Sequence, residues 1–168
     1  MTSIAYIDGQ NLYKAISGAE DPWELDMFRF RTYLRRKYGI DEAHYFFGFS
    51  DPSNQSLYTI IQNAGFTIMW REHGSEVLGK KKGNVDTDIV FQSLHDFIER
   101  PDIEKIYFVS GDGDYFKTVR YLLEKGKLGR VLFPVRRNVS ALYRMIPESN
   151  KAYLDAPGAK EKIARRKK

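Results

Sequence analysis

Short apolar runs alternate with amphipathic segments along most of this 168-residue chain, and that alternation limits the folds open to it. Apolar residues at helical spacing predict helices, and short continuous apolar runs predict buried strands. Strands that alternate with helices pair in parallel through right-handed crossovers. We therefore predict a three-layer α/β/α sandwich around a mainly parallel five-stranded sheet. The expected strands are residues 4–7, 43–49, 66–70, 106–109 and 131–135, and the expected helices are residues 28–38, 54–64, 85–98, 115–124 and 139–146.

The composition excludes several kinds of site. The chain has no cysteine, which removes disulfides and thiolate-bound metals, and its three histidines lack the close spacing of zinc ligands. No run approaches the roughly 18 apolar residues that a membrane span requires. Residues 1–4 do not read as a secretory signal. We therefore expect a cytoplasmic protein with no membrane partner.

Positive charge is concentrated at one end of the sequence. The net charge is +5, and residues 160–168 hold six basic residues and one acid, so the rest of the chain is nearly neutral. We interpret residues 1–155 as the folded domain and residues 156–168 as a flexible basic tail. Such a tail favours contact with a polyanion, and it equally fits a solvated end that only aids solubility.

Aspartates follow two of the predicted strands. Asp8 comes directly after the run at residues 4–7, and Asp112 and Asp114 follow the run at residues 106–109. Ligands bind beyond the carboxyl ends of the strands in an open parallel sheet. We therefore expect these three carboxylates to share one edge of the sheet.

A fourth aspartate lies in the first turn of the helix predicted from residue 85, for which Asn84 is a plausible N-cap. Asp86 lies on the same face of this helix as a row of apolar residues, Val90, Leu94 and Phe97. That face should turn inward and place Asp86 at the edge where the strands end. Asp88 points to roughly the opposite side and is the weaker candidate.

Four carboxylates at one edge repel one another strongly. A pair ~4 Å apart costs about 4 kcal/mol at an effective dielectric near 20, whereas a small domain has a total stability of ~5–15 kcal/mol. A divalent cation removes this cost, and all-oxygen ligands suit Mg²⁺ or Mn²⁺. Such an ion can activate water and neutralise a phosphodiester. Each acid alone also fits a helix cap or a turn, so the predicted metal site depends on their coincidence at one edge.

Three short motifs occur in order along the chain and together carry a family resemblance. Residues 6–12 contain Asp-Gly-Gln-Asn, residues 83–88 read Gly-Asn-Val-Asp-Thr-Asp, and residues 109–116 contain Ser-Gly-Asp-Gly-Asp-Tyr. They resemble the Asp-Gly-x-Asn, Lys-Gly-x-Val-Asp and Ser-Gly-Asp-x-Asp-Phe motifs of the NYN domain, also called LabA-like, a branch of the PIN-like nucleases. The resemblance spans residues 4–146.

This resemblance implies a PIN-like sheet with strand order 3-2-1-4-5 and a metal-dependent ribonuclease. The residues implied to bind Mg²⁺ or Mn²⁺ are Asp8, Asp86, Asp112 and Asp114. Asn11 would orient a water on the metal or a substrate phosphate, and Ser110 would hold an aspartate through its hydroxyl. Many members carry a further Asp where this chain has Gln92. Gln92 lies one turn beyond Asp88, so the loss of that Asp weakens any second metal site on the helix face of Asp88.

Basic residues near the same edge are candidates for binding RNA phosphates. Lys80, Lys81 and Lys82 precede the helix expected from residue 85, and Arg136 and Arg137 follow the fifth strand. Both groups also fit ordinary surface charge. Four aromatic residues are candidates for stacking on unpaired bases, although such residues are more often core: Tyr13, Trp23, Phe28 and Trp70.

The favoured function is metal-dependent hydrolysis of RNA phosphodiester bonds. Gln92 and the basic tail motivate an alternative, a regulator that binds RNA or protein and keeps the acidic pocket without turnover. A phosphatase with Asp8 as nucleophile is disfavoured, because haloacid-dehalogenase-type enzymes usually have a second Asp where this chain has Gln10. PIN-like domains often pair, so the resemblance also leaves a homodimer open.

Overall fold

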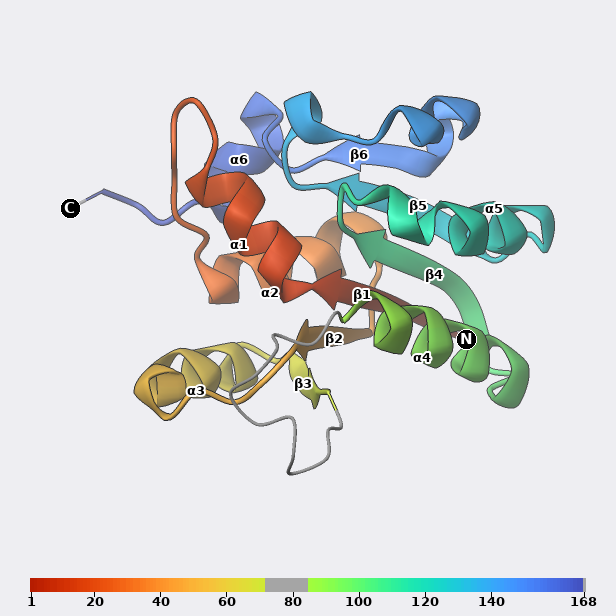
Figure 1. Ribbon diagram of the computed structural model, residues 1–168, viewed down its shortest axis with the longest axis horizontal. Coiled ribbons are helices and arrows are strands. Elements are labelled where there is room, and N and C mark those ends of the chain that lie inside the picture. The colour runs from red at the N-terminus through yellow and green to blue at the C-terminus, as the bar shows by residue number, and fades with distance from the viewer. Residues whose placement is uncertain (72–84, 168) are drawn as a thin grey trace.

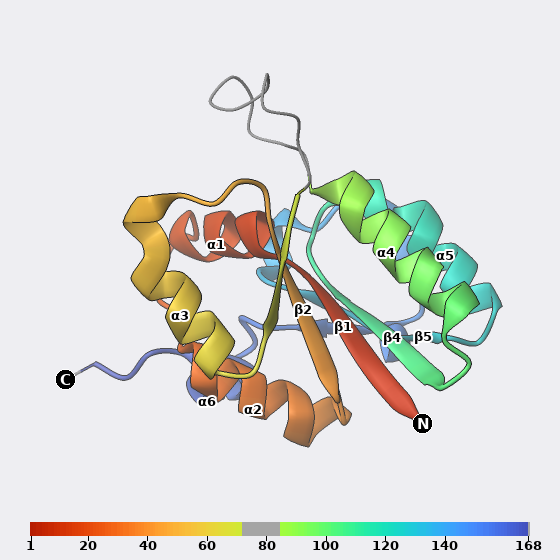
Figure 2. The ribbon, with the colours of Figure 1, turned by 90° about the horizontal axis from the view of Figure 1, so that it is seen from below.

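The computed structural model describes residues 1–71 and 85–167, which form a three-layer α/β/α sandwich (Figures 1 and 2). One parallel sheet of six strands has the order β3-β2-β1-β4-β5-β6. The strands are β1 (Thr2–Asp8), β2 (Glu42–Phe47), β3 (Thr67–Trp70), β4 (Ile103–Val109), β5 (Leu128–Phe133) and β6 (Lys151–Tyr153). The helices are α1 (Gly9–Ser17), α2 (Met27–Tyr38), α3 (Gln55–Asn63), α4 (Asp86–Glu99), α5 (Phe116–Glu124) and α6 (Pro157–Ile163).

Helices cover both faces of the sheet, so the core is divided into two layers. Helices α4 and α5 lie on one face, and α1, α2, α3 and α6 lie on the other (Figure 2). Successive side chains of a strand point to opposite faces, so in β1 Ile4 and Tyr6 pack in the first layer and Ala5 and Ile7 in the second. Of the helices in the described ranges, none is both long and apolar enough to cross a membrane.

The predicted fold class and the order of the first five strands are confirmed, and the sheet has one strand more than expected. Strand β6 pairs with β5 in parallel, with Val131 opposite Lys151. It has three residues, Lys-Ala-Tyr, which form no apolar run. A strand this short and polar carries too weak a signal to be recognised from sequence patterning.

Two further local predictions differ from the structure. Gly9 is the first residue of α1, a helix that the sequence did not predict and whose N-cap is Asp8. Residues 139–146 were expected to form a helix, whereas the regular part is a 3₁₀ helix at Ala141–Met145. Ser140 caps that segment by accepting a hydrogen bond from the Leu142 amide, and Pro147 follows it closely.

The prediction that residues 156–168 form a flexible tail was wrong for most of that segment. Residues 157–163 form α6, in which Ala159 and Ile163 are buried. The chain returns along the sheet through β6, and the Asp26 amide donates to the Ile163 carbonyl oxygen at 2.9 Å. A single isoleucine among lysines gives little sequence signal, yet Ile163 fills a space in the core next to α2.

Helix α4 is rotated relative to its sequence prediction. Its deepest residues are Ile89, Ser93 and Asp96, whereas the predicted apolar row is only half-buried. Asp96 can lie inward because the Tyr6 hydroxyl donates to its Oδ2 at 2.6 Å. The N-cap position is Val85, and Asn84 lies outside the described residues.

Candidate metal centre

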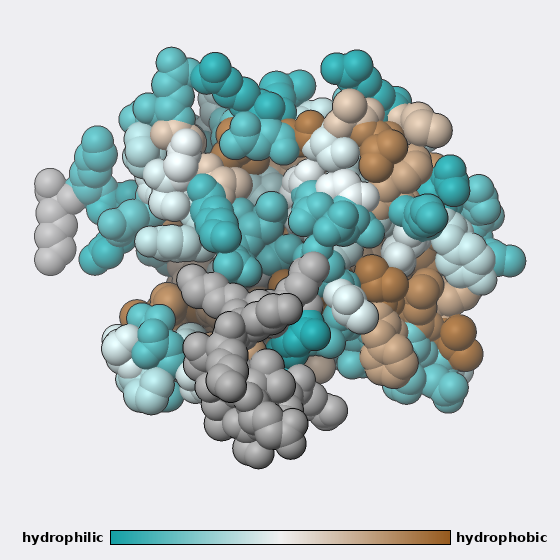
Figure 3. All heavy atoms as spheres, viewed as in Figure 1, coloured by the Kyte–Doolittle hydropathy of each residue, from teal (hydrophilic) through white to brown (hydrophobic). Residues whose placement is uncertain are grey.

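The carboxyl ends of β1 and β4 meet at one edge of the sheet, where a pocket of about 280 Å³ opens. Strand β1 ends at Asp8, and Ile7 pairs with Val109, the last residue of β4. Figure 3 shows hydrophilic residues gathered across the middle of this face. The residues that line the pocket are Asp8, Gln10, Asn11, Lys14, Val85, Asp86, Asp112 and Asp114.

The turn from β1 into α1 positions Asp8 and Asn11. The Asn11 amide donates to Asp8 Oδ1 at 3.1 Å, so the aspartate caps the helix. Gly9 is required here, because a Cβ on it would collide with the Tyr45 ring and lie 2.9 Å from the Phe46 carbonyl oxygen. The Asp-Gly pair therefore lets the backbone pass against β2 while it holds the carboxylate at the pocket.

The loop between β4 and α5 is fixed by its own side chains. Ser110 Oγ accepts from the Asp112 amide at 3.1 Å, and Asp112 Oδ1 accepts from the Asp114 amide at 2.9 Å. Asn11 Oδ1 accepts from the Gly111 amide at 3.1 Å, which ties this loop to α1. These bonds hold the loop and α1 together around the pocket.

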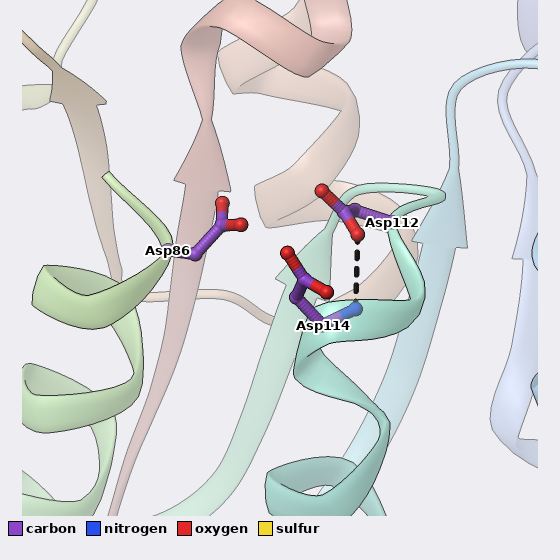
Figure 4. A group of neighbouring side chains, drawn as sticks. All are labelled: Asp86, Asp112 and Asp114. Atoms are coloured by element: carbon purple, nitrogen blue, oxygen red, sulfur yellow. Dashed lines mark hydrogen bonds between the residues drawn. The ribbon is translucent and has the colours of Figure 1, made fainter. Parts of the chain in front are cut away.

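Three carboxylates point toward one another across the pocket (Figure 4). One oxygen from each of Asp86, Asp112 and Asp114 lies within 4.8 Å of the other two. Asp86 comes from the start of α4, and the other two come from the loop before α5. Oxygen-only donors at this spacing fit Mg²⁺ or Mn²⁺ and not a soft metal.

Asp8 lies beside this cluster but outside the three-residue group, and it is 4% exposed. The Tyr115 hydroxyl bridges it to the cluster, at 2.9 Å from Asp8 Oδ2 and 2.7 Å from Asp86 Oδ1. A phenol has one proton and can donate to only one of these carboxylates at a time. Asp8 is therefore oriented by Tyr115 and the Asn11 amide at the back of the pocket.

Burial and neighbouring carboxylates make Asp8 and Asp86 harder to ionise. Burial is the main cause of the raised pKa of Asp8, and neighbouring Asp112 adds to it. Burial, followed by a side-chain contact with Asp114, raises the pKa of Asp86 to about 7. Burial also raises the pKa of Tyr115, so its hydroxyl stays protonated. A bound cation would favour the ionised carboxylates and oppose these shifts.

The structure does not bring the predicted arginines into the pocket. Arg136 lies over the Tyr153 ring at 3.7 Å, and Arg137 Nη1 pairs with Glu20 Oε2 at 3.0 Å. Lys80, Lys81 and Lys82 lie outside the described residues. Asp88 is not part of the three-residue group, and its Oδ2 lies 4.0 Å from Arg71 Nη1.

Gln92, where many family members carry an aspartate, contacts a residue outside the acidic pocket. Its side-chain amide donates to Asp96 Oδ1 at 2.9 Å, and it does not line the acidic pocket. A carboxylate at this position would face the carboxylate of Asp96. In this chain the glutamine that replaces the family's aspartate therefore makes a partly buried hydrogen bond.

Sequence reasoning missed three residues of the pocket region. Gln10 and Lys14 line it from α1, a helix that was not predicted. Lys14 follows Asn11 by three residues, so the helical spacing would have placed both on one side. Tyr115 directly follows Asp114 in the third motif, and its hydroxyl contacts appear only in the folded chain.

One solved structure shares this architecture. A crystal structure of a protein of unknown function from Vibrio parahaemolyticus superposes with a TM-score of 0.77 at 21% identity, covering 98% of this chain and 96% of that one. N-carbamoylsarcosine amidase from Thermoplasma acidophilum covers 91% of this chain and 95% of its own at 13% identity, with a TM-score of only 0.35. No curated protein matches the chain. The NYN domain profile matches residues 3–145, and the chain therefore belongs to the NYN domain family, with a PIN-like nuclease fold.

Proposed function

We propose that this chain is a metal-dependent ribonuclease that hydrolyses RNA phosphodiester bonds. The observation that carries the proposal is the convergence of Asp86, Asp112 and Asp114 within 4.8 Å in a member of a nuclease superfamily. These three residues would hold Mg²⁺ or Mn²⁺. When bound, such an ion supplies the positive charge and Lewis acidity that favour attack on a phosphodiester.

The other pocket residues have separate roles in this proposal. Hydrolysis joins the oxygen of a water to phosphorus, breaks one P–O bond and releases the proton of that water. Asp8 is the candidate to accept the proton, because burial raises its pKa toward the working range of a general base. Lys14 is the one cation among the described residues of the pocket, and in this proposal it contacts a phosphate oxygen.

Cleavage of a labelled single-stranded RNA by the purified full chain tests the proposal. We expect cleavage with Mn²⁺ and none with EDTA. Asp112→Asn should slow cleavage by about a hundredfold or more, because one charged oxygen of the cluster is lost. The amide oxygen of the new side chain can still accept from the Asp114 amide, so the circular dichroism spectrum should not change.

The matched control is Asp21→Asn, which removes a carboxylate whose side chain is 95% exposed and does not line the pocket. It should cleave at the wild-type rate. Equal rates for Asp112→Asn and wild type would place the cleavage outside this pocket and contradict the proposal. RNA binding without cleavage under any divalent ion would instead favour the regulatory alternative.

A further inference from the structure

A groove of about 540 Å³ lies between α2 and α6, far from the acidic pocket. In Figure 2 these two helices lie at the bottom of the view, at the opposite end from the start of α4, where Asp86 is. The groove has four basic residues and two aromatic rings among its lining residues: Arg29, Arg36, Lys37, Lys162, Phe28 and Tyr33. Among the residues that the structure describes, no acidic residue lines it.

The outer face of α2 supplies most of this lining. The inner face of the helix is buried through Met27, Phe30, Arg31 and Leu34, which leaves the residues between them to face outward. From Phe28 to Lys37 the exposed side runs for roughly 13 Å along the helix axis. It is long enough to contact more than one unit of an extended chain.

Hydrogen bonds across the groove fix its second wall. Arg29 donates from Nη1 to the Ala164 carbonyl oxygen at 2.6 Å and from Nη2 to the Glu161 carbonyl oxygen at 2.8 Å. Leu25 and Ala164 form a bridge of antiparallel strand type next to these bonds. Arg29 is therefore occupied in holding α6, and the groove has a defined shape before any ligand arrives.

The remaining basic residues of the groove have no compensating charge. Within residues 1–71 and 85–167, Arg36, Lys37 and Lys162 form no ion pair, and all three are exposed. Like charges in one groove repel each other, and a chain of phosphates would relieve that repulsion. The basic segment at 165–167 continues from the end of α6.

An exposed ring accompanies these charges. Phe28 is 52% exposed on the same outward side of α2. Aromatic rings set among cations are the combination that proteins use for single-stranded nucleic acid, since bases stack on the rings while the cations contact phosphates. A purely acidic peptide would use the cations and leave the ring unused.

We infer that this groove is a second RNA-binding site, which holds a single-stranded part of the RNA away from the acidic pocket. Arg36, Lys37 and Lys162 contact phosphates, and Phe28 stacks on a base. The identity of the ligand as RNA rests on the proposed function, whereas the preference for a polyanion with stacking groups rests on the groove alone.

The test measures binding of a fluorescein-labelled oligouridylate by fluorescence anisotropy in EDTA, so that no cleavage occurs. The triple variant Arg36→Gln, Lys37→Gln and Lys162→Gln should weaken binding by about tenfold or more. The slope of log affinity against log salt should fall by about two, since each lost contact to a single strand removes roughly 0.7. Phe28→Ala should weaken binding with little change in that slope.

The control variant removes the same charges from the other face of the sheet: Lys117→Gln, Arg120→Gln and Lys125→Gln, all exposed on or beside α5. It should bind the probe as the wild type does. Wild-type affinity in the groove variant, or an equal loss in the control, would overturn the inference. Displacement of the probe by polyglutamate as readily as by unlabelled RNA would overturn RNA as the ligand.

Failure of this inference is distinguishable from failure of the proposed function. Asp112→Asn should bind the probe in EDTA at least as tightly as the wild type. Groove-dependent binding in a protein that cleaves no RNA would contradict the nuclease and leave the groove as a binding site. Metal-dependent cleavage, together with unchanged RNA binding in the groove variant, would support the nuclease and contradict the groove as a binding site.

Discussion

Helix α4 has an aspartate near each end that contacts a tyrosine hydroxyl, and the two surroundings differ sharply. At the first residue, Asp86 shares the Tyr115 hydroxyl with Asp8 and lies within 4.8 Å of two more carboxylates. Near the last turn, Asp96 is 5% exposed, and each of its oxygens accepts a hydrogen bond, from Tyr6 at 2.6 Å and Gln92 at 2.9 Å.

The difference lies in the balance between donors and negative charges. Around Asp96, several donors surround one carboxylate, which is the arrangement that keeps a buried acid stable. Around Asp86, two carboxylates share one phenol proton and two more carboxylates lie close by, and burial, followed by the side-chain contact with Asp114, raises the pKa of Asp86 to about 7. Clustered negative charge in an open pocket is typical of a cation-binding site, whereas a buried acid with its hydrogen bonds satisfied is typical of a structural contact.

The largest expected effect comes from the same substitution made at both ends of α4. Asp86→Asn should reduce Mn²⁺-dependent RNA cleavage by about a hundredfold or more, because it removes one of three converging carboxylates. It should leave the melting temperature of the metal-free protein unchanged or higher, since it also removes repulsion. Single-turnover cleavage rates and thermal melts in EDTA measure the two effects.

Asp96→Asn should show the opposite pattern. It replaces a charged acceptor that is buried between Tyr6 and Gln92, so the free energy of unfolding should fall by about 1–2 kcal/mol. The cleavage rate of the folded variant should stay near wild type. Equal losses of activity in both variants at constant stability would contradict the distinction between the acidic pocket at Asp86 and the buried contacts of Asp96.

Addition of metal should give the next largest effect. An ion that binds only the native state at a hundred times its dissociation constant stabilises that state by about 2.7 kcal/mol. For a domain of this size, each kcal/mol shifts the melting temperature by roughly 2–4 °C. Differential scanning fluorimetry with Mn²⁺ should show this rise in the wild type and in Asp96→Asn. The same rise in Asp86→Asn would indicate that the ion binds elsewhere.

Sequence patterning predicted the parts of this molecule that depend on local order. The strand runs set the sheet, and the motifs contain the aspartates and Asn11 that the structure brings to one pocket. The spacing of apolar residues could not set the rotation of α4, because a tertiary bond between Tyr6 and Asp96 determines which side turns inward.

The same limit explains the missed residues. Gln92 looked like a lost metal ligand in the sequence, yet α4 turns it toward Asp96. The Tyr115 hydroxyl contacts Asp8 from 107 residues away, a separation that no local pattern encodes. Arg29 of α2, more than 130 residues earlier in the sequence, stabilises helix α6 through its hydrogen bonds. The short, basic sequence of α6 therefore resembled a flexible tail when read alone.

The dependence of stability on pH should test the surroundings of Asp86 further. In metal-free protein the pKa of Asp86 is about 7, above its unfolded value near 3.9. The native state therefore binds more protons in this window, and stability should fall as the pH rises from about 4 to about 7. Because solvent partly screens Asp86, we expect a loss of about 1–2 kcal/mol.

Denaturant unfolding in EDTA across this pH range measures the effect, and Asp86→Asn is the reference. The variant lacks this titrating group, so its stability should fall less between pH 4 and pH 7. Parallel pH curves for wild type and Asp86→Asn would show that Asp86 does not lose its proton in this window and would contradict the prediction.

The smallest expected effect is that of the tyrosine that joins Asp8 to the cluster. Tyr115→Phe removes the hydroxyl between Asp8 and Asp86 but leaves the ring packed near Phe108. A typical hydrogen bond contributes about 0.5–1.5 kcal/mol, so the Mn²⁺ dissociation constant should rise roughly threefold to tenfold. Isothermal titration calorimetry with Mn²⁺ measures this change directly.

Tyr6→Phe removes the corresponding hydroxyl at the other end of α4 and provides the matched control. It should lower the free energy of unfolding, because Asp96 loses its shortest hydrogen bond while it remains buried. It should not change the Mn²⁺ dissociation constant, since Asp96 is buried and does not line the acidic pocket. An equal loss of Mn²⁺ affinity in both phenylalanine variants would mean that α4 transmits strain between its ends, and the two clusters would then have to be treated as one site.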